Sequence, residues 1–216
     1  RLIREARAML QQGVVGKVEM IRSVFASVHE APSEWQRHRA SGGGAIFDQA
    51  IHVFDLWRFM LESEVEEVFA ISRSGPWDDE TVTISARLFS GVLATATCSE
   101  RTGENNEVEV YGRGGRLQVS CYRFDGLEYF PHASIPGNGR ARVDAFLRTV
   151  KELPGRLVQL RHGGDVLASY HEQWRHFLWA IRHDGPLGCT MDDGRRALEI
   201  VFAAMASASC GQPVIV

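Results

Sequence analysis

The 216-residue sequence has no long hydrophobic run, no paired cysteines and no excess of either charge. No apolar stretch approaches the roughly 20 residues of a membrane span, and no signal peptide is recognised, so a cytoplasmic protein is expected. The four cysteines form no C-x-x-C pair, which argues against a zinc ribbon or a disulfide scaffold. With 24 basic and 27 acidic residues the formal net charge is −3, so neither nucleic acid nor a membrane is expected as a partner.

The sequence also lacks a phosphate-binding glycine loop. The glycines at 112, 114 and 115 are followed by Leu117, so the pattern G-x-G-x-x-G fails at its last position, and a strand is predicted to follow instead of a helix. The pattern that starts at Gly137 fails at Arg142 in the same way. We therefore expect no dinucleotide-binding βαβ unit, and no cofactor-binding residue, within this chain.

Hydrophobic periodicity predicts strands in the middle of the chain. Residues 2–12 first form an amphipathic helix that ends at Gly13. Alternating β-branched residues then predict strands, and the connections between them are too short for parallel crossovers. The prediction is an antiparallel meander of about six strands, at 65–72, 81–89, 92–99, 107–111, 116–121 and 127–130.

Other elements flank this meander. A strand-like stretch at 17–28 and a helix at 45–61 precede it, and helices at 143–152, 165–184 and 192–210 and a closing strand at 213–216 follow it. The fold class predicted is α+β, with an open, mostly antiparallel sheet of about six strands and helices packed on one face. The other face of the sheet is expected to be solvated or covered by a partner.

The most informative segment is the helix at 45–61, which follows three glycines at 42–44. At about 100° per residue, Asp48, His52 and Asp55 fall in one narrow band along an otherwise apolar helix. Burial of two carboxylates and an imidazole is costly unless they are paired or used. Because Asp48 precedes His52 by one turn, its carboxylate can orient the imidazole and raise its basicity, as a general base requires.

Two other interpretations of this band stay open. A satisfied core histidine with two structural carboxylates would have the same spacing. His52 and Asp48 could also supply two metal ligands, but no third ligand is evident, so no metal is predicted. The glycine triplet would let a ligand or a second domain approach the helix N-terminus, where free amide groups favour an anion.

Weaker candidates lie on the loop before the triplet. Trp35 and Arg37 could line a pocket through stacking and an arginine fork. A solvated basic loop, which also includes His38 and Arg39, explains the same residues. The acidic run at 78–80 is expected to form a turn before a strand.

Two patterns on the helix at 165–184 favour structural roles. Tyr170, Trp174 and Phe177 have the spacing of a helix core. Glu172 and His176 are also four residues apart, but on a strongly amphipathic helix a surface pair is the simpler interpretation.

Taken together, these motifs resemble the second domain of the Gfo/Idh/MocA family of oxidoreductases. The family motif G-G-G-x-x-x-D-x-G-x-H-x-x-D is matched by the glycine triplet, Asp48, His52 and Asp55, with Ala50 in place of its last glycine. The helix and turn at 6–16 resemble the segment that leads out of the family's nucleotide-binding domain. Similarity at Gly185-Pro186, Asp193-Gly194 and Gly211 extends the resemblance over nearly all of residues 1–216, with residues 1–14 as the leading helix.

The resemblance implies hydride transfer between a sugar or polyol hydroxyl carbon and NAD or NADP. It implies that His52 removes the hydroxyl proton and that Asp48 orients the substrate or the histidine, while Trp35, Arg37 and Asp55 are candidates for substrate binding. The cofactor domain, with the lysine of its E-K-P motif, is missing from this sequence, so the chain alone is expected to be inactive. A homodimer or homotetramer through the sheet face is expected. The alternative is a non-catalytic binding or assembly module that keeps the fold without a cofactor domain.

Overall fold

The computed structural model describes residues 1–28, 33–123, 126–132 and 164–216, and the single positions 139, 143, 147 and 150. The predicted helix at 143–152 therefore lies almost wholly outside the described residues. The helices are α1 (Leu2–Gln11), α2 (Ile51–Leu61), α4 (Gly164–His183) and α5 (Met191–Cys210), with short turns η1 (Glu34–Arg37), η2 (Arg39–Ser41) and η3 (Ile46–Ala50). The strands are β1 (Val18–Val28), β2 (Val65–Arg73), β3 (Thr81–Leu88), β4 (Leu93–Ser99), β5 (Arg101–Gly112), β6 (Gly115–Ser120), β7 (Leu127–Pro131) and β8 (Val214–Ile215).

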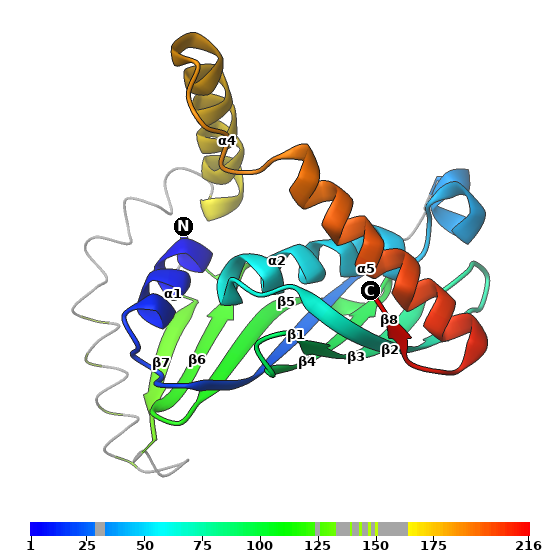
Figure 1. The fold of residues 1–216 in the computed structure, drawn as a ribbon, viewed down its shortest axis with the longest axis horizontal. Helices are drawn as coiled ribbons and strands as arrows, with labels where there is room; N and C mark the ends of the chain where they lie inside the picture. Colours follow the sequence, from blue (N-terminus) through cyan, green and yellow to red (C-terminus); the bar gives the residue numbers. More distant parts are fainter. Residues whose placement is uncertain are drawn as a thin grey trace.

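The sheet has eight strands in the order β7-β6-β5-β1-β4-β3-β2-β8 (Figure 1). The α+β class and the mostly antiparallel pairing are confirmed, but the count of about six strands and the continuous meander are wrong. Strand β1 is inserted between β4 and β5, parallel to β4 and antiparallel to β5. Between the end of β1 and the start of β4 lie 64 residues, which include α2, β2 and β3, and this is long enough for the parallel crossover that the short connections exclude.

The insertion of β1 places Glu100 at a corner of the sheet. Ala26 near the end of β1 pairs with Ser99 of β4, and Val28 pairs with Arg101 of β5. The chain therefore crosses the end of β1 between these two pairs, and Glu100 is the residue that makes the crossing. Its amide donates a hydrogen bond to the Glu80 carbonyl at 3.0 Å.

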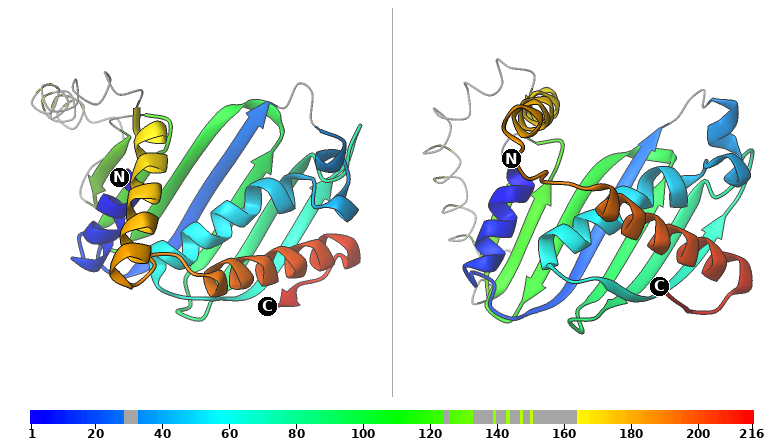
Figure 2. Two further views of the ribbon diagram at one scale, coloured as in Figure 1. Left: turned by 90° about the horizontal axis from the view of Figure 1, so that it is seen from above. Right: turned by 45° about the horizontal axis from the view of Figure 1, so that its top comes forward.

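Helices α1, α2 and α5 cover one face of the sheet and bury its core (Figure 2). The strict alternation of buried and exposed residues along β3 and β4 is typical of strands with one covered face. Trp57 and Phe54 of α2 are fully buried against this face, and the Trp57 indole N–H donates to Ser23 Oγ at 2.9 Å. The core thus fixes which side of α2 faces away from the sheet.

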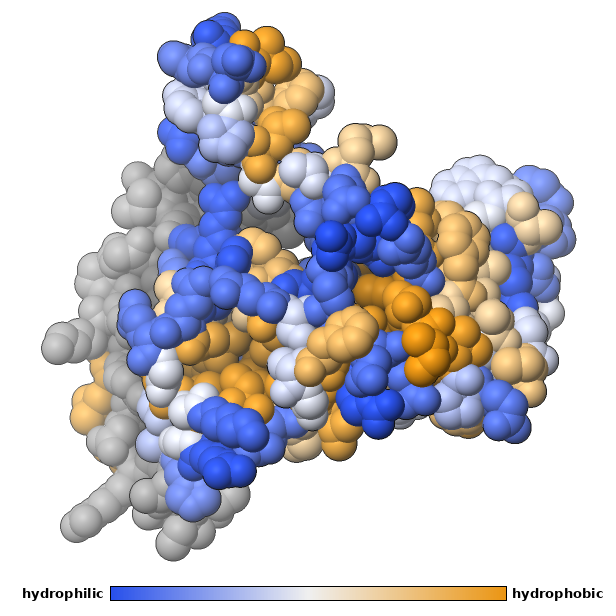
Figure 3. Space-filling view, in the orientation of Figure 1, coloured by the Kyte–Doolittle hydropathy of each residue, from blue (hydrophilic) through white to orange (hydrophobic). Residues whose placement is uncertain are grey.

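Helix α4 stands away from the sheet (Figure 1), and hydrophobic side chains are exposed on it between Tyr170 and Ile181 (Figure 3). The prediction that Tyr170, Trp174 and Phe177 form a helix core is wrong for this chain, because they are 59%, 63% and 44% exposed. Their spacing makes an amphipathic face, but no sheet lies beneath it. Among the described residues, no helix combines the length and the hydropathy needed to cross a membrane.

Candidate functional site

The glycine triplet closes a tight loop and does not form an open cradle. The amides of residues 42–45 donate to the backbone carbonyls of Arg39, His38, Gln36 and Asp79 at 2.9 to 3.1 Å. A Cβ on Gly43 would lie 2.2 Å from the Gln36 carbonyl oxygen, and one on Gly44 would lie 2.7 Å from the Asp78 carbonyl oxygen. The triplet thus offers no free amides of its own, and two of its three glycines are needed because backbone packs directly against them.

The helix after the triplet begins with a π turn, η3, and becomes α-helical at Ile51. The angular spacing of residues in a regular α-helix therefore does not apply to Asp48, which lies in the π turn. Asp48 is half-buried, whereas His52 is exposed, with its ring centroid 6.3 Å from that of Phe25 on β1. Among the described residues no hydrogen bond or ion pair joins Asp48 to His52, so the pairing of these two side chains stays a prediction.

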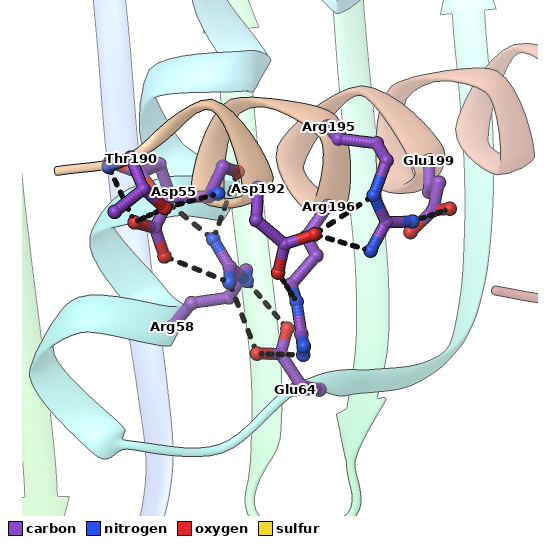
Figure 4. A network of polar contacts seen from close by, with 9 residues as sticks. Asp55, Arg58, Glu64, Thr190, Asp192, Arg195, Arg196 and Glu199 are labelled. Carbon is purple, nitrogen blue, oxygen red and sulfur yellow. Dashed lines mark hydrogen bonds and ion pairs between the residues drawn. The ribbon is translucent and has the colours of Figure 1, made fainter.

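Asp55, one turn after His52, belongs to a network that ties α2 to α5 (Figure 4). Its Oδ1 accepts a hydrogen bond from Arg58 at 3.2 Å, and the Arg58 guanidinium also contacts Glu64 and Asp193. Desolvation raises the pKa of Asp55, and the positive charges of Arg58 and His52 oppose that rise. Asp55 thus lies close enough to His52 to interact with its charge, while Arg58 holds it from the other side.

Trp35 and Arg37 lie on η1, on the loop that packs against the triplet. The Trp35 side chain is half exposed, and the Arg37 guanidinium lies 3.8 Å from Glu34. Their substrate-binding roles stay predictions. Arg39, expected to be part of a solvated loop, instead forms a bidentate ion pair with the fully buried Asp79 at 2.6 and 2.7 Å.

The acidic turn at 78–80 is confirmed, and the carboxylates of Asp79, Glu80 and Asp48 all act on the buried Glu100. Asp79 is paired with Arg39, and Glu80 Oε1 lies 3.9 Å from Arg101 Nε. Glu100 is fully buried, and neither of its carboxyl oxygens has a hydrogen-bond partner among the described residues. Burial, and secondly the charge of Asp48, raise the pKa of Glu100 to about 7. Glu100 carries no sequence motif and was not predicted as a site residue, because only the crossing over β1 makes it buried.

Elsewhere in the described residues, three features could form another site: possible metal ligands, a cavity and a histidine on α4. No cluster of three or more potential metal ligands occurs in the described part of the chain. A cavity of about 920 Å³ lies between α1 and α4, but none of the candidate residues lines it. Glu172 and His176 are exposed, as expected for a surface pair. They have separate partners, because Glu172 bonds Arg175 and His176 Nε2 accepts from the Gly188 amide at 2.9 Å.

Comparison with known proteins identifies the class to which this fold and motif belong. The model of the GFO/IDH/MocA C-terminal domain matches residues 3–118, more than half of the chain. The chain therefore belongs to the Gfo/Idh/MocA family, and the described fold is that of its C-terminal domain.

Several of the individual proteins that the chain resembles are dehydrogenases or other oxidoreductases. It is 26% identical, over 96% of its length, to the myo-inositol 2-dehydrogenase of Thermotoga maritima, and it covers 58% of that protein. The fold matches an oxidoreductase domain protein from Kribbella flavida at a TM-score of 0.74 and 15% identity, covering 100% of this chain and 62% of the other. It also matches the WlbA dehydrogenase of Bordetella pertussis, solved in complex with NADH and UDP-GlcNAcA, at 0.72 and 17%, covering 100% and 61%. The chain thus spans somewhat more than half the length of the relatives it matches.

Proposed function

We propose that this chain is the substrate-binding and catalytic-base domain of an NAD(P)-dependent oxidoreductase that acts on a sugar or polyol hydroxyl. The observation that carries the proposal is the position of His52. Its imidazole is exposed on α2, within the family motif, while the neighbouring Val53 and Phe54 are buried in the core. A satisfied core histidine would be buried with a hydrogen-bond partner, so the exposed ring favours a role toward a ligand.

His52 would remove the proton of the substrate hydroxyl. An imidazole suits this task because its pKa lies near neutral pH, so the neutral base and its protonated form are both accessible. Asp55 lies close enough to stabilise the imidazolium that forms, and Arg58 keeps its carboxylate in place. Asp48, Trp35 and Arg37 would orient the sugar or polyol around the hydroxyl that reacts.

A nicotinamide cofactor, when bound, supplies the hydride acceptor or donor for such a reaction. The described residues do not fit a dinucleotide. The triplet amides are taken by backbone carbonyls, and the 112–115 glycines form a hairpin between β5 and β6. We therefore assign cofactor binding to residues outside this chain and derive no step through the cofactor.

The test uses a full-length protein that joins this chain to its nucleotide-binding domain. In His52→Ala, turnover with any accepted sugar or polyol should fall about a hundredfold or more. NAD(P) binding, followed by fluorescence titration, should be nearly unchanged. His171→Ala, an exposed histidine on α4, is the matched control and should keep full turnover.

Two results would contradict the proposal. Equal loss of turnover and cofactor binding in His52→Ala would show that His52 acts through structure and not as a base. A wild-type protein that turns over no sugar or polyol would instead favour the non-catalytic binding or assembly module.

We also propose that the uncovered sheet face joins copies of the chain into a homodimer or homotetramer. Thr83, Ser85, Thr95 and Thr97 of β3 and β4 are exposed on that face, with the hydrophobic side chain of Leu93 beside them. Small side chains without net charge allow two flat surfaces to approach closely.

A further inference from the structure

The buried group around Glu100 has too many hydrogen-bond acceptors. Glu80 Oε1, Gln49 Oε1 and both carboxyl oxygens of Glu100 are buried without a partner among the described residues. The nearby Trp77 indole N–H favours the ionised form of Glu100 but makes no hydrogen bond of normal geometry to it. Four buried oxygens therefore face one unpartnered donor, the Trp77 N–H, and a protonated Glu100 adds a second donor that an ionised Glu100 cannot supply.

The charges around Glu100 also favour its protonated form. From the turn before β3 it faces Asp79, which Arg39 neutralises, and Glu80, which Arg101 approaches to 3.9 Å. From η3 it faces Asp48. No cation contacts Glu100 itself among the described residues, so a second charge beside Asp48 would be buried and uncompensated.

Gln49 connects this buried group to the candidate site. Its Nε2 donates to Ser27 Oγ at 2.7 Å and to the carbonyl of Ser99, which precedes Glu100, at 3.2 Å. The π turn that carries Asp48 is thereby fixed to the ends of β1 and β4. The charge of Glu100 and that of Asp48 therefore influence each other across a backbone that Gln49 holds in place.

We propose that Glu100 is a positioning residue whose carboxyl group keeps its proton below neutral pH, so that Asp48 carries the single negative charge of this pair. Two adjacent carboxyl groups that hold one proton form a coupled pair, in which the more buried group keeps the proton. Glu100 does not touch the substrate in this scheme. It sets the charge and the place of Asp48, which makes the proposal depend on the function proposed above.

The first test needs no activity and uses the chain as it is. Carbon-13 NMR of the glutamate carboxyl groups should show Glu100, assigned through Glu100→Gln, titrating near neutral pH. In Asp48→Asn its midpoint should move down, because the repelling charge is gone. In Asp184→Asn, which removes a carboxylate at the far end of α4, it should not move. A Glu100 midpoint in the ordinary glutamate range of about 4.3, or one that Asp48→Asn leaves in place, would overturn the proposal.

The second test uses the full-length enzyme and its pH profile. A catalytic base makes kcat/KM rise with pH, whereas ionisation of Glu100 should make it fall. The wild-type profile should show this fall above neutral pH, and Glu100→Gln should lack the fall while keeping activity at lower pH. Glu100→Ala, which leaves a cavity and no polar group, should lose activity at every pH. Identical profiles for wild type and Glu100→Gln would refute the positioning role. That outcome is distinct from failure of the proposed function, which His52→Ala decides.

Discussion

The Arg58 network offers a sharp test of how α2 is held in place. The Arg58 side chain is only 7% exposed, and its guanidinium bonds Glu64 at 2.5 and 3.1 Å, Asp55 at 3.2 Å and the Asp193 carbonyl at 3.2 Å. Figure 4 shows these contacts converging on one side chain between α2, the start of β2 and the N-terminus of α5. Arg58→Met keeps much of the volume and removes every polar contact.

The expected loss of unfolding free energy in Arg58→Met lies between two limits. Breaking a fully buried pair costs about 3–5 kcal/mol, whereas an exposed pair contributes about 0–1 kcal/mol. The carboxylates left behind are 37–49% exposed, so water can solvate them in Arg58→Met. We therefore expect a loss of about 2 kcal/mol, which corresponds to a fall in Tm of roughly 4–8 °C for a chain of this size.

Arg195→Met is the matched control for this prediction. Arg195 belongs to the same region and pairs with Asp192 and Glu199, but its side chain is 56% exposed. The expected loss is about 0.5 kcal/mol, or a fall in Tm of roughly 2 °C or less. Thermal unfolding followed by far-UV circular dichroism measures both variants. Equal falls in the two would refute the argument from burial.

The effect of Arg58→Met on thermal stability should also depend on pH. The hydrogen bond from Arg58 is the main reason that the pKa of Glu64 is lowered in the folded chain. Its contribution to stability is present above the ordinary glutamate pKa of about 4.3 and is lost as the pH falls through the lowered value. The difference in Tm between wild type and Arg58→Met should therefore narrow on acidification. A Tm difference that does not change with pH would mean that packing of the Arg58 side chain, and not its charge, stabilises this contact between α2 and α5.

Two further predictions concern the triplet and the sheet face. Gly43→Ala should lose about 2 kcal/mol in urea unfolding, because its Cβ would overlap the Gln36 carbonyl, whereas Gly103→Ala, which has open space around it, should change stability by less than about 0.5 kcal/mol. Equal effects would argue against backbone packing as the reason for the glycine. Thr95→Arg on the free sheet face should lower the mass measured by light scattering to that of a monomer, while Ala206→Arg, exposed on α5, should not; a wild-type monomer would contradict the assembly.

Local patterns were sufficient for most of the elements. Helices α1, α4 and α5 and strands β2 to β4 and β6 to β8 lie where periodicity and turn residues place them, since each depends on neighbours close in sequence. Strand β5 was predicted at 107–111 but already begins at Arg101. The position of β1 within the sheet could not be predicted in this way. Its pairing with β4 joins residues more than 70 positions apart, and nothing in either strand alone specifies it.

Local patterns also do not specify what packs against a helix, and this explains the exposed face of α4. An amphipathic pattern predicts that a helix has a hydrophobic face, but not what covers that face. Trp174 and Phe177 have core spacing and are nevertheless exposed here, because the sheet surface that α4 would need is already taken by α1, α2 and α5. Periodicity therefore identified the helix correctly and its environment wrongly.

In the candidate site too, some residues could be predicted from a local motif and others depend on the order of the strands. Asp48, His52 and Asp55 were found because a short motif on one helix carries them, and the structure adds that Arg58 and the π turn set their different environments. Glu100 carries no motif, and at the end of a strand before Arg101 it has the pattern of a solvent-exposed acid. Only the passage of the chain over β1 encloses it. Sequence patterns assign Glu100 to the surface, but the order of the strands buries it and lets it interact with Asp48. A titration of Glu100 near neutral pH would therefore result from the sheet order and not from a local motif.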